Sequence, residues 1–239
     1  MPKARPMAYT ASALCTLCRP IRPADAAQKA AAASSKHSSA EDVDRLCIAI
    51  GISTGGPPAL THLFESLTPP MPPIVVVQHM PGQFTGPFSK RLDNISDLSI
   101  KEAESGDVLE KNHVYVAPGG LQLHLLQRGR ITKIDVQDGE PVSGHKPSVD
   151  VMMNDAARIF GERCLGVVMT GMGRDGSDGC RAIKQAGGYV LGQDQQSSDV
   201  YGMNKVAFTE GNVHEQFSLD DAAAVLTASL AKLGCAAPA

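Results

Sequence analysis

From Arg45 onward, short apolar runs alternate with longer stretches that have a helical pattern. Runs such as 74–78 and 164–169 are apolar almost throughout, which is typical of strands buried on both faces of a sheet. The helices between such strands must then cover both faces. The sequence therefore predicts an α/β fold in three layers, with a mainly parallel sheet between two layers of helices.

The same patterns place the individual elements. The expected strands are 46–50, 74–78, 98–103, 113–117, 121–127, 131–136, 164–169, 189–193 and 212–215, and the expected helices are 57–67, 84–93, 149–160, 177–186, 203–210 and 218–233. Pro57 suits the first turn of a helix, and Ser148 is the expected N-cap of another. The two strands around Gln127-Arg128-Gly129-Arg130 are predicted to form an antiparallel hairpin at the edge of the sheet.

The first 42 residues differ in character from the rest. They contain the low-complexity run Ala-Ala-Ala-Ser-Ser-Lys-His-Ser-Ser at 31–39 and carry six basic against three acidic residues. We expect a disordered tail or linker over 1–42 and a folded domain over 43–236. The apolar part of the tail is broken by Thr and Ser, so a signal peptide is not favoured. Cys15 and Cys18 have no second pair at ligand spacing, and no metal site is predicted.

Composition excludes several classes of function. Residues 43–239 carry 16 basic and 22 acidic residues, and the chain has no Trp, so nucleic-acid binding is not expected. No apolar run is long enough to cross a bilayer, and we expect no membrane insertion. Cys47, Cys164 and Cys180 fall in buried-looking elements, which favours free thiols in a reducing compartment and a cytoplasmic protein.

The segment after the first expected strand has the pattern G-x-S-x-G, with Ser53 between Gly51 and Gly55. Glycines at these positions allow a sharp turn from strand to helix, because they carry no Cβ. Such a turn presents one hydroxyl beside the free N–H groups of a helix N-terminus, which is how a nucleophile for acyl transfer is displayed. Strand-to-helix glycine turns also occur for purely structural reasons, so the pattern alone does not establish catalysis.

Ser53, His79 and Asp175 each follow an expected strand of the parallel sheet. Active groups of open parallel sheets gather beyond the carboxyl ends of the strands, so we expect these three side chains to converge. A hydroxyl, an imidazole and a carboxylate are the groups that a Ser-His-Asp mechanism needs. In α/β-hydrolases the chain order is Ser, Asp, His, and strands precede the nucleophile strand, so a different fold is expected here.

The sequence leaves alternatives to these three residues open. His113 and His145 compete with His79 as the base, but neither follows a buried parallel strand. Asp178 competes with Asp175, although Asp178 could simply cap the following helix. The glycine-rich loop 170–176 could bind phosphate, but no Walker lysine follows it and no acid ends strand 74–78 to bind a ribose.

Several motifs in series resemble the catalytic domain of the chemotaxis protein-glutamate methylesterases, the CheB type. The resemblance covers about residues 45–230, in order and with plausible spacing. It rests on Gly51-Ile52-Ser53-Thr54-Gly55-Gly56-Pro57, Val77-Gln78-His79-Met80-Pro81, Phe84-Thr85, Tyr115-Val116-Ala117-Pro118-Gly119, His145-Lys146-Pro147-Ser148-Val149-Asp150 and Thr170-Gly171-Met172-Gly173-Arg174-Asp175-Gly176.

The resemblance implies hydrolysis of γ-glutamyl methyl esters on the cytoplasmic helices of methyl-accepting chemoreceptors, and in some members deamidation of receptor glutamines. It implies Ser53 as nucleophile, His79 as general base and acid, and Asp175 as orienting carboxylate. It also implies the Met172 backbone N–H as oxyanion donor and Thr54 as a polar partner beside the site. No metal or organic cofactor is expected.

Two other functions stay open: a non-catalytic adaptor that binds receptors, and a general small-ester hydrolase. Regulated members of the family carry an N-terminal receiver domain that is phosphorylated on an aspartate. About 42 residues precede the first expected strand here, too few for such a domain. Regulation of this chain by aspartyl phosphorylation is therefore not expected.

Overall fold

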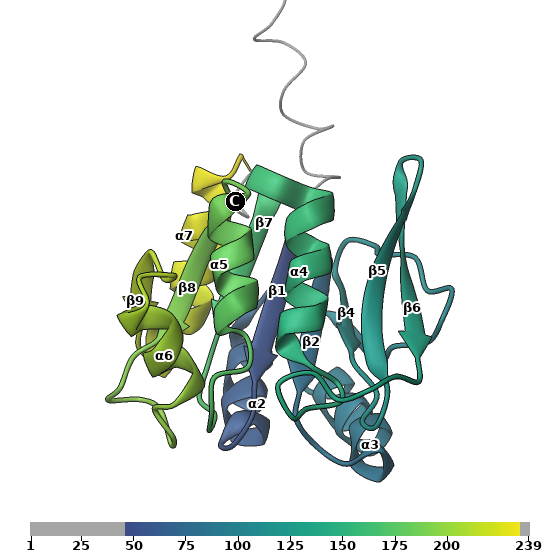
Figure 1. Ribbon diagram of the computed structural model, residues 1–239, viewed down its shortest axis with the longest axis horizontal. Coiled ribbons are helices and arrows are strands. Elements are labelled where there is room, and N and C mark those ends of the chain that lie inside the picture. The colour runs from purple at the N-terminus through teal and green to yellow at the C-terminus, as the bar shows by residue number, and fades with distance from the viewer. Residues whose placement is uncertain (1–45, 235–239) are drawn as a thin grey trace, which may run out of the picture. The chain divides into compact units, whose positions relative to one another are not determined.

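The computed structural model describes residues 46–234, which contain a seven-stranded sheet with the strand order β3-β4-β2-β1-β7-β8-β9 (Figure 1). Every neighbouring pair in this sheet is parallel. Its strands are β1 (Cys47–Ile52), β2 (Ile74–Gln78), β3 (Ser99–Glu102), β4 (His113–Val116), β7 (Cys164–Val168), β8 (Tyr189–Gln193) and β9 (Glu215–Phe217). The predicted α/β class is confirmed.

Helices cover both faces of the sheet (Figure 1). They are α2 (Gly56–Ser66), α3 (Gly82–Asp93), α4 (Val149–Phe160), α5 (Ser177–Gln185), α6 (Met203–Thr209) and α7 (Ala222–Lys232), with short 3₁₀ turns η2 (Gly161–Arg163) and η3 (Leu219–Asp221). One core packs α2, α3 and α7 against the sheet, and a second packs α4, α5 and α6 against the opposite face. The three-layer prediction is therefore confirmed.

Strand β1 contributes side chains to both cores in alternation. Ile48 and Ile50 belong to the core beneath α2 and α7, whereas Cys47 and Ala49 belong to the core beneath α4 and α5. All six residues of the strand are buried. The continuous apolar run thus arises because successive side chains of a strand point to opposite faces, and both faces are covered here.

The hairpin of β5 (Gln122–Arg128) and β6 (Ile131–Gln137) is antiparallel, as predicted. It does not extend the edge of the main sheet, however, but forms a two-stranded sheet of its own. Leu123, Leu125 and Ile134 pack into the core that also contains α4. The hairpin stands beside α4 in Figure 1 and takes the place of a helix over that part of the sheet.

The chain after residue 210 differs in detail from the prediction. The last strand begins at Glu215 rather than at 212, because the N–H of Asn212 bonds to the carbonyl of Ala207 and closes α6. The expected helix over 218–233 opens with the 3₁₀ turn η3 and continues as α7. Both differences lie away from the carboxyl ends of the central strands.

Strand β1 lies between β2 and β7, which are its two neighbours in the sheet. The chain runs from β1 to β2 on one side and returns to β7 on the other, so the strand order reverses at β1. Ligand sites of open parallel sheets lie outside such a point, at the carboxyl ends of the strands. The segments after β1, β2 and β7 are therefore brought together.

The predicted tail over 1–42 lies outside the described residues, and the limits 43–236 of the folded domain stay a prediction. Within residues 46–234, no helix combines the length and the apolar character needed to cross a membrane.

Substitution of Gly119 tests the packing of the loops around this edge. A Cβ at Gly119 would lie 2.3 Å from the carbonyl oxygen of Met80 and 2.5 Å from the amide nitrogen of Gly82, so two loops would have to separate. We expect Gly119→Ala to lower the free energy of unfolding by about 1–3 kcal/mol, measured by denaturant titration. Gly139→Ala is the control, because its Cβ would meet only Cγ of Gln122 at 3.7 Å. Equal stability of the two variants would contradict this prediction.

Candidate active site

Ser53 lies in the turn that joins β1 to α2. Its N–H bonds to the carbonyl of Thr170 at 2.9 Å, and its own carbonyl accepts the N–H of Gly56 at 2.8 Å. Gly55 has φ 82°, a left-handed conformation that favours glycine. The turn therefore fixes the backbone of Ser53 against the end of β7. Its side chain is partly exposed and makes no hydrogen bond within residues 46–234.

Gly51 has a role different from the predicted one. It lies inside β1 rather than in the turn, and a Cβ there would lie 2.2 Å from Cγ1 of Val149. The absence of a side chain lets α4 approach the strand closely. Of the two glycines that flank Ser53, only Gly55 supplies the unusual turn conformation.

His79 follows β2. Its backbone N–H bonds at 3.2 Å to the carbonyl of Ile52, the residue directly before Ser53. Its Nε2 lies 2.8 Å from Oδ2 of Asp175. The imidazole is 10% exposed and the carboxylate is fully buried. An ionised carboxylate only accepts hydrogen bonds, so Nε2 carries the proton. The other ring nitrogen, Nδ1, is buried without a hydrogen-bond partner in the described part of the chain.

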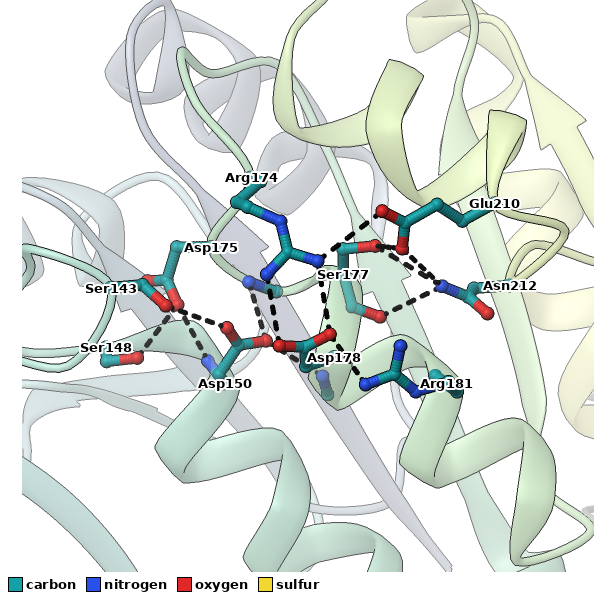
Figure 2. A network of polar contacts seen from close by, with 12 residues as sticks. Ser143, Ser148, Asp150, Arg174, Asp175, Ser177, Asp178, Arg181, Glu210 and Asn212 are labelled. Atoms are coloured by element: carbon teal, nitrogen blue, oxygen red, sulfur yellow. Dashed lines mark hydrogen bonds and ion pairs between the residues drawn. The ribbon is translucent and has the colours of Figure 1, made fainter.

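Asp175 is held by the N-terminus of α4. The N–H of Val149 donates to Oδ2 at 2.8 Å, and the N–H of Asp150 donates to Oδ1 at 3.1 Å. The hydroxyl of Ser148 also donates to Oδ1, at 2.8 Å (Figure 2). Burial by itself would raise the pKa of Asp175, but the hydrogen bonds from His79 and α4 outweigh it and hold the pKa below its usual value. The carboxylate is therefore ionised at neutral pH.

Gln78 joins the segments that carry Ser53 and His79. Its Nε2 donates to the carbonyl of Ser53 at 3.0 Å and to the carbonyl of His79 at 2.9 Å. The side chain is buried at the end of β2, and its Oε1 has no partner among the residues described. A Cβ on Gly56 would overlap this oxygen. Gln78 thus fixes the spacing between the two turns.

The competing histidines lie in different places. The ring of His145 stacks on the ring of His79, with centroids 3.8 Å apart and planes at 4°. Burial, and then the neighbouring His79, lower the pKa of His145, which favours its neutral form. His113 stacks instead on Tyr115, and its Nδ1 lies 2.9 Å from the carbonyl oxygen of Lys111. Of these three histidines, only His79 bonds to Asp175.

Asp178 lies in the first turn of α5 and does not cap that helix. It forms ion pairs with Arg174 at 3.1 Å and Arg181 at 2.7 Å (Figure 2). These contacts lower its pKa, with the hydrogen bond from Arg174 as the largest cause. Asp178 is therefore a surface partner of arginines, and Asp175 is the carboxylate that reaches the histidine.

Met172 and Thr54 flank the Ser53 turn. Met172 is 69% exposed, and its backbone N–H makes no hydrogen bond within the described chain. It follows Gly171, where a Cβ would lie 2.8 Å from Cβ of Ser53. Thr54 is an exposed residue, and its backbone carbonyl accepts a hydrogen bond from the hydroxyl of Thr170 at 2.9 Å. Residues 171–172 thus lie directly beside Ser53.

Sequence reasoning placed Ser53, His79 and Asp175 at one edge but did not assign three supporting contacts. Gln78, the His145 ring and the hydroxyl of Ser148 all contact the segments that carry them. A buried polar residue at the end of an apolar strand was the available signal for Gln78. The stacking of His145 had no signal, because it depends on where the loop before α4 folds.

The site therefore combines a free hydroxyl, an imidazole with one unpaired ring nitrogen, and an ionised carboxylate, the set of groups that serine hydrolases use. Comparisons with known proteins identify the family. The family model for CheB methylesterase matches residues 48–226. The chain thus belongs to the CheB methylesterase family.

Individual relatives support this assignment. A protein-glutamate methylesterase/protein-glutamine glutaminase of Treponema denticola is 48% identical over 180 residues, which cover 75% of this chain and 48% of that protein. A relative of the same name from Caulobacter vibrioides is 45% identical over 172 residues, or 72% of this chain and 50% of that protein. This chain matches about half the length of these relatives.

A solved structure extends the comparison to the fold. The CheB methylesterase catalytic domain of Thermotoga maritima matches with a TM-score of 0.74 and 35% sequence identity, covering 76% of this chain and 96% of that domain.

Ser148 offers a test of how α4 holds Asp175. Ser148→Ala removes one donor to the buried carboxylate and the N-cap of α4, whose hydroxyl accepts the N–H of Val151 at 3.5 Å. We expect a loss of about 2 kcal/mol in the free energy of unfolding at pH 7. The lowered pKa of Asp175 in the folded state stabilises the fold at pH values above the pKa of this group in the unfolded state, and this stabilisation is lost on acidification. The variant has less of it to lose, so its stability should fall less than that of the wild type as the pH falls.

The control for this prediction is Ser66→Ala, which removes an exposed bond to the carbonyl of His62. It should change the free energy of unfolding by at most about 0.5 kcal/mol. Denaturant titrations of both variants at pH 7 and pH 3 provide the comparison. A Ser148→Ala variant as stable as Ser66→Ala would show that the contact contributes nothing.

Proposed function

We propose that this protein is a serine hydrolase that removes methyl groups from glutamate γ-methyl esters of chemoreceptors. The observation that carries the proposal is the orientation of His79. Its Nε2 is bound to Asp175 and its buried Nδ1 is left unpaired, while its backbone N–H bonds to the carbonyl of Ile52, the residue before Ser53. A base held in one tautomer, with a free lone pair for the proton of a serine hydroxyl, is what the activation of a serine requires.

In this mechanism Nδ1 of His79 takes the proton of the Ser53 hydroxyl as Oγ attacks the ester carbonyl. The imidazolium that forms is stabilised by the ionised Asp175, which stays ionised itself. His79 then returns the proton to the leaving methoxide, so methanol departs and the glutamyl group remains on Ser53. Water, activated by the same imidazole, hydrolyses this ester and releases glutamate.

The oxyanion of the tetrahedral intermediate requires a donor near Ser53. The N–H of Met172 suits this role, because it follows Gly171 against Ser53 and has no other acceptor among residues 46–234. One preorganised donor of this kind typically lowers the barrier by about 3–4 kcal/mol. Thr54 completes the polar surroundings of the turn. These residues supply the chemistry without a metal or an organic cofactor.

The substrate class follows from the relatives. Their name couples methylesterase with glutaminase activity on protein-bound glutamate and glutamine. Transposed to this chain, the ester substrate is a methylated glutamate on the cytoplasmic helices of a chemoreceptor, and the protein acts in the cytoplasm. A receptor glutamine would react by the same steps, with ammonia in place of methanol.

Ser53→Ala tests the proposal directly. We expect methanol release from a methylated chemoreceptor to fall at least about a thousandfold, because the nucleophile is lost while the fold is unchanged. Methanol is measured by gas chromatography, and folding by circular dichroism. Ser66→Ala, an exposed serine on the adjoining α2, is the control and should retain wild-type activity.

Full activity in Ser53→Ala would rule the proposal out. Receptor binding by the wild type without release of methanol or ammonia would favour a non-catalytic adaptor instead. Hydrolysis of simple esters as fast as methylated receptor would favour a general small-ester hydrolase.

Met172 tests the oxyanion donor separately, because proline lacks an N–H and alanine keeps one. We expect Met172→Pro to lower kcat about a hundredfold further than Met172→Ala does, with KM nearly unchanged. Steady-state methanol release by the two variants gives the comparison, and circular dichroism checks that both fold. Equal kcat values for the folded variants would exclude the backbone of residue 172 from the mechanism.

A further inference from the structure

The N-termini of α4 and α5 each bind a carboxylate from the other segment. Asp175, just before α5, is bound by the N–H groups of Val149 and Asp150 in the first turn of α4. In return Oδ1 of Asp150 accepts the N–H of Gly176 at 2.9 Å and the N–H of Gly179 at 2.8 Å. Each helix N-terminus, which carries a partial positive charge, is thus satisfied by an acid from the other segment.

The two helices are packed closely enough for this exchange because residue 179 has no side chain. A Cβ at Gly179 would lie 2.5 Å from Cβ of Met153 and 3.4 Å from Cα of Asp150. The residue that precedes Gly176 is Asp175 itself. Asp150 therefore holds both the carboxylate of Asp175, through its N–H, and the backbone that follows it, through its side chain.

Asp150 is buried, and no cation lies within ion-pair distance of it in the part of the chain described. Burial, together with the nearby Asp175 and Asp178, raises its pKa to about 6 in spite of the hydrogen bond from Gly179. The groups that face it are Asp175 and Gly176 from the loop after β7, Asp178, Gly179 and Cys180 from α5, and Ser143 from the loop before α4.

A raised pKa means that the ionised carboxylate of Asp150 lowers the stability of the fold at neutral pH. The sign follows from linkage, because the folded state binds its proton more tightly than the unfolded state does. An asparagine could accept the same two N–H groups through one oxygen without a buried charge. The retained charge therefore calls for a role other than stability.

We propose that Asp150 is a positioning residue for the reaction: its N–H and its side chain hold the segment of Asp175 in place, and its negative charge, placed behind that carboxylate, makes His79 a stronger base. This inference rests on the proposed function. Asp150 makes no hydrogen bond to the imidazole or to Ser53 and acts on them through the position of Asp175 and through its own charge. A second anion behind the first favours the imidazolium that forms when His79 takes the proton of Ser53.

The test uses Asp150→Asn, with Asp155→Asn as the matched control. Asp155 lies on the same helix but bonds to His124 at 3.0 Å, away from the site. The readout is the rate at which a fluorophosphonate probe labels Ser53 between pH 5 and 9, which needs no knowledge of the natural substrate. We expect labelling of Asp150→Asn at pH 8 to be about tenfold to a hundredfold slower than wild type, and that of Asp155→Asn to be unchanged.

The pH profile separates positioning from a purely structural role. In the wild type the acid limb should include the ionisation of Asp150, so it should report one ionisation more than the acid limb of Asp150→Asn. The free energy of unfolding of Asp150→Asn at pH 8 should equal or exceed that of the wild type. With methylated receptor as substrate, kcat should fall while KM stays constant.

Wild-type labelling rates and a wild-type profile in Asp150→Asn would overturn the proposal, and so would slow labelling that merely accompanies a loss of stability. If that variant does not fold, the pH profile of wild-type labelling is the test. An acid limb that reports one ionisation overturns the proposal, and an acid limb that reports two supports it. If the probe labels Ser53 of the wild type but no methanol is released, only the proposed function is overturned. The labelling rates of the variants then still test the role of Asp150.

Discussion

Asp175 accepts four hydrogen bonds, three from the start of α4 and one from His79 after β2. This carboxylate is fully buried, so its charge is tolerable only because every one of these donors is in place. The geometry of the site depends on that interaction. With Asp175 fixed by α4, Nε2 of His79 is bound, and Nδ1 is the ring nitrogen left to meet a hydroxyl.

The contacts that support the site all restrict the motion of the groups that they hold. Gln78 spans the carbonyls of Ser53 and His79, Thr170 anchors the Ser53 turn to β7, and the ring of His145 lies flat on His79. Each contact removes a degree of freedom from a side chain or turn that must be positioned to within a fraction of an ångström. The turn that presents Ser53 is thus braced from both neighbouring strands, and its hydroxyl alone is left free.

Much of this arrangement could be predicted because it follows from local sequence. The G-x-S-x-G pattern located the turn at Ser53, and the apolar runs located the strands that precede His79 and Asp175. The expectation that these strand ends are neighbours is confirmed, since β1 pairs with both β2 and β7. The hairpin was wrongly placed at the sheet edge, because strand pattern alone does not distinguish a strand paired in the sheet from one packed across its face.

The sequence by itself determined the alternation of elements, the buried strands and the polar residues at their ends, because these depend on neighbours a few positions apart. Only the tertiary structure decided that the first turn of α4 lies against the loop after β7. The N–H of Asp150 donates to Asp175 across 25 positions of chain, and no periodicity in the sequence records such a contact. The direction in which His79 points is settled by that packing and not by the strand that carries it.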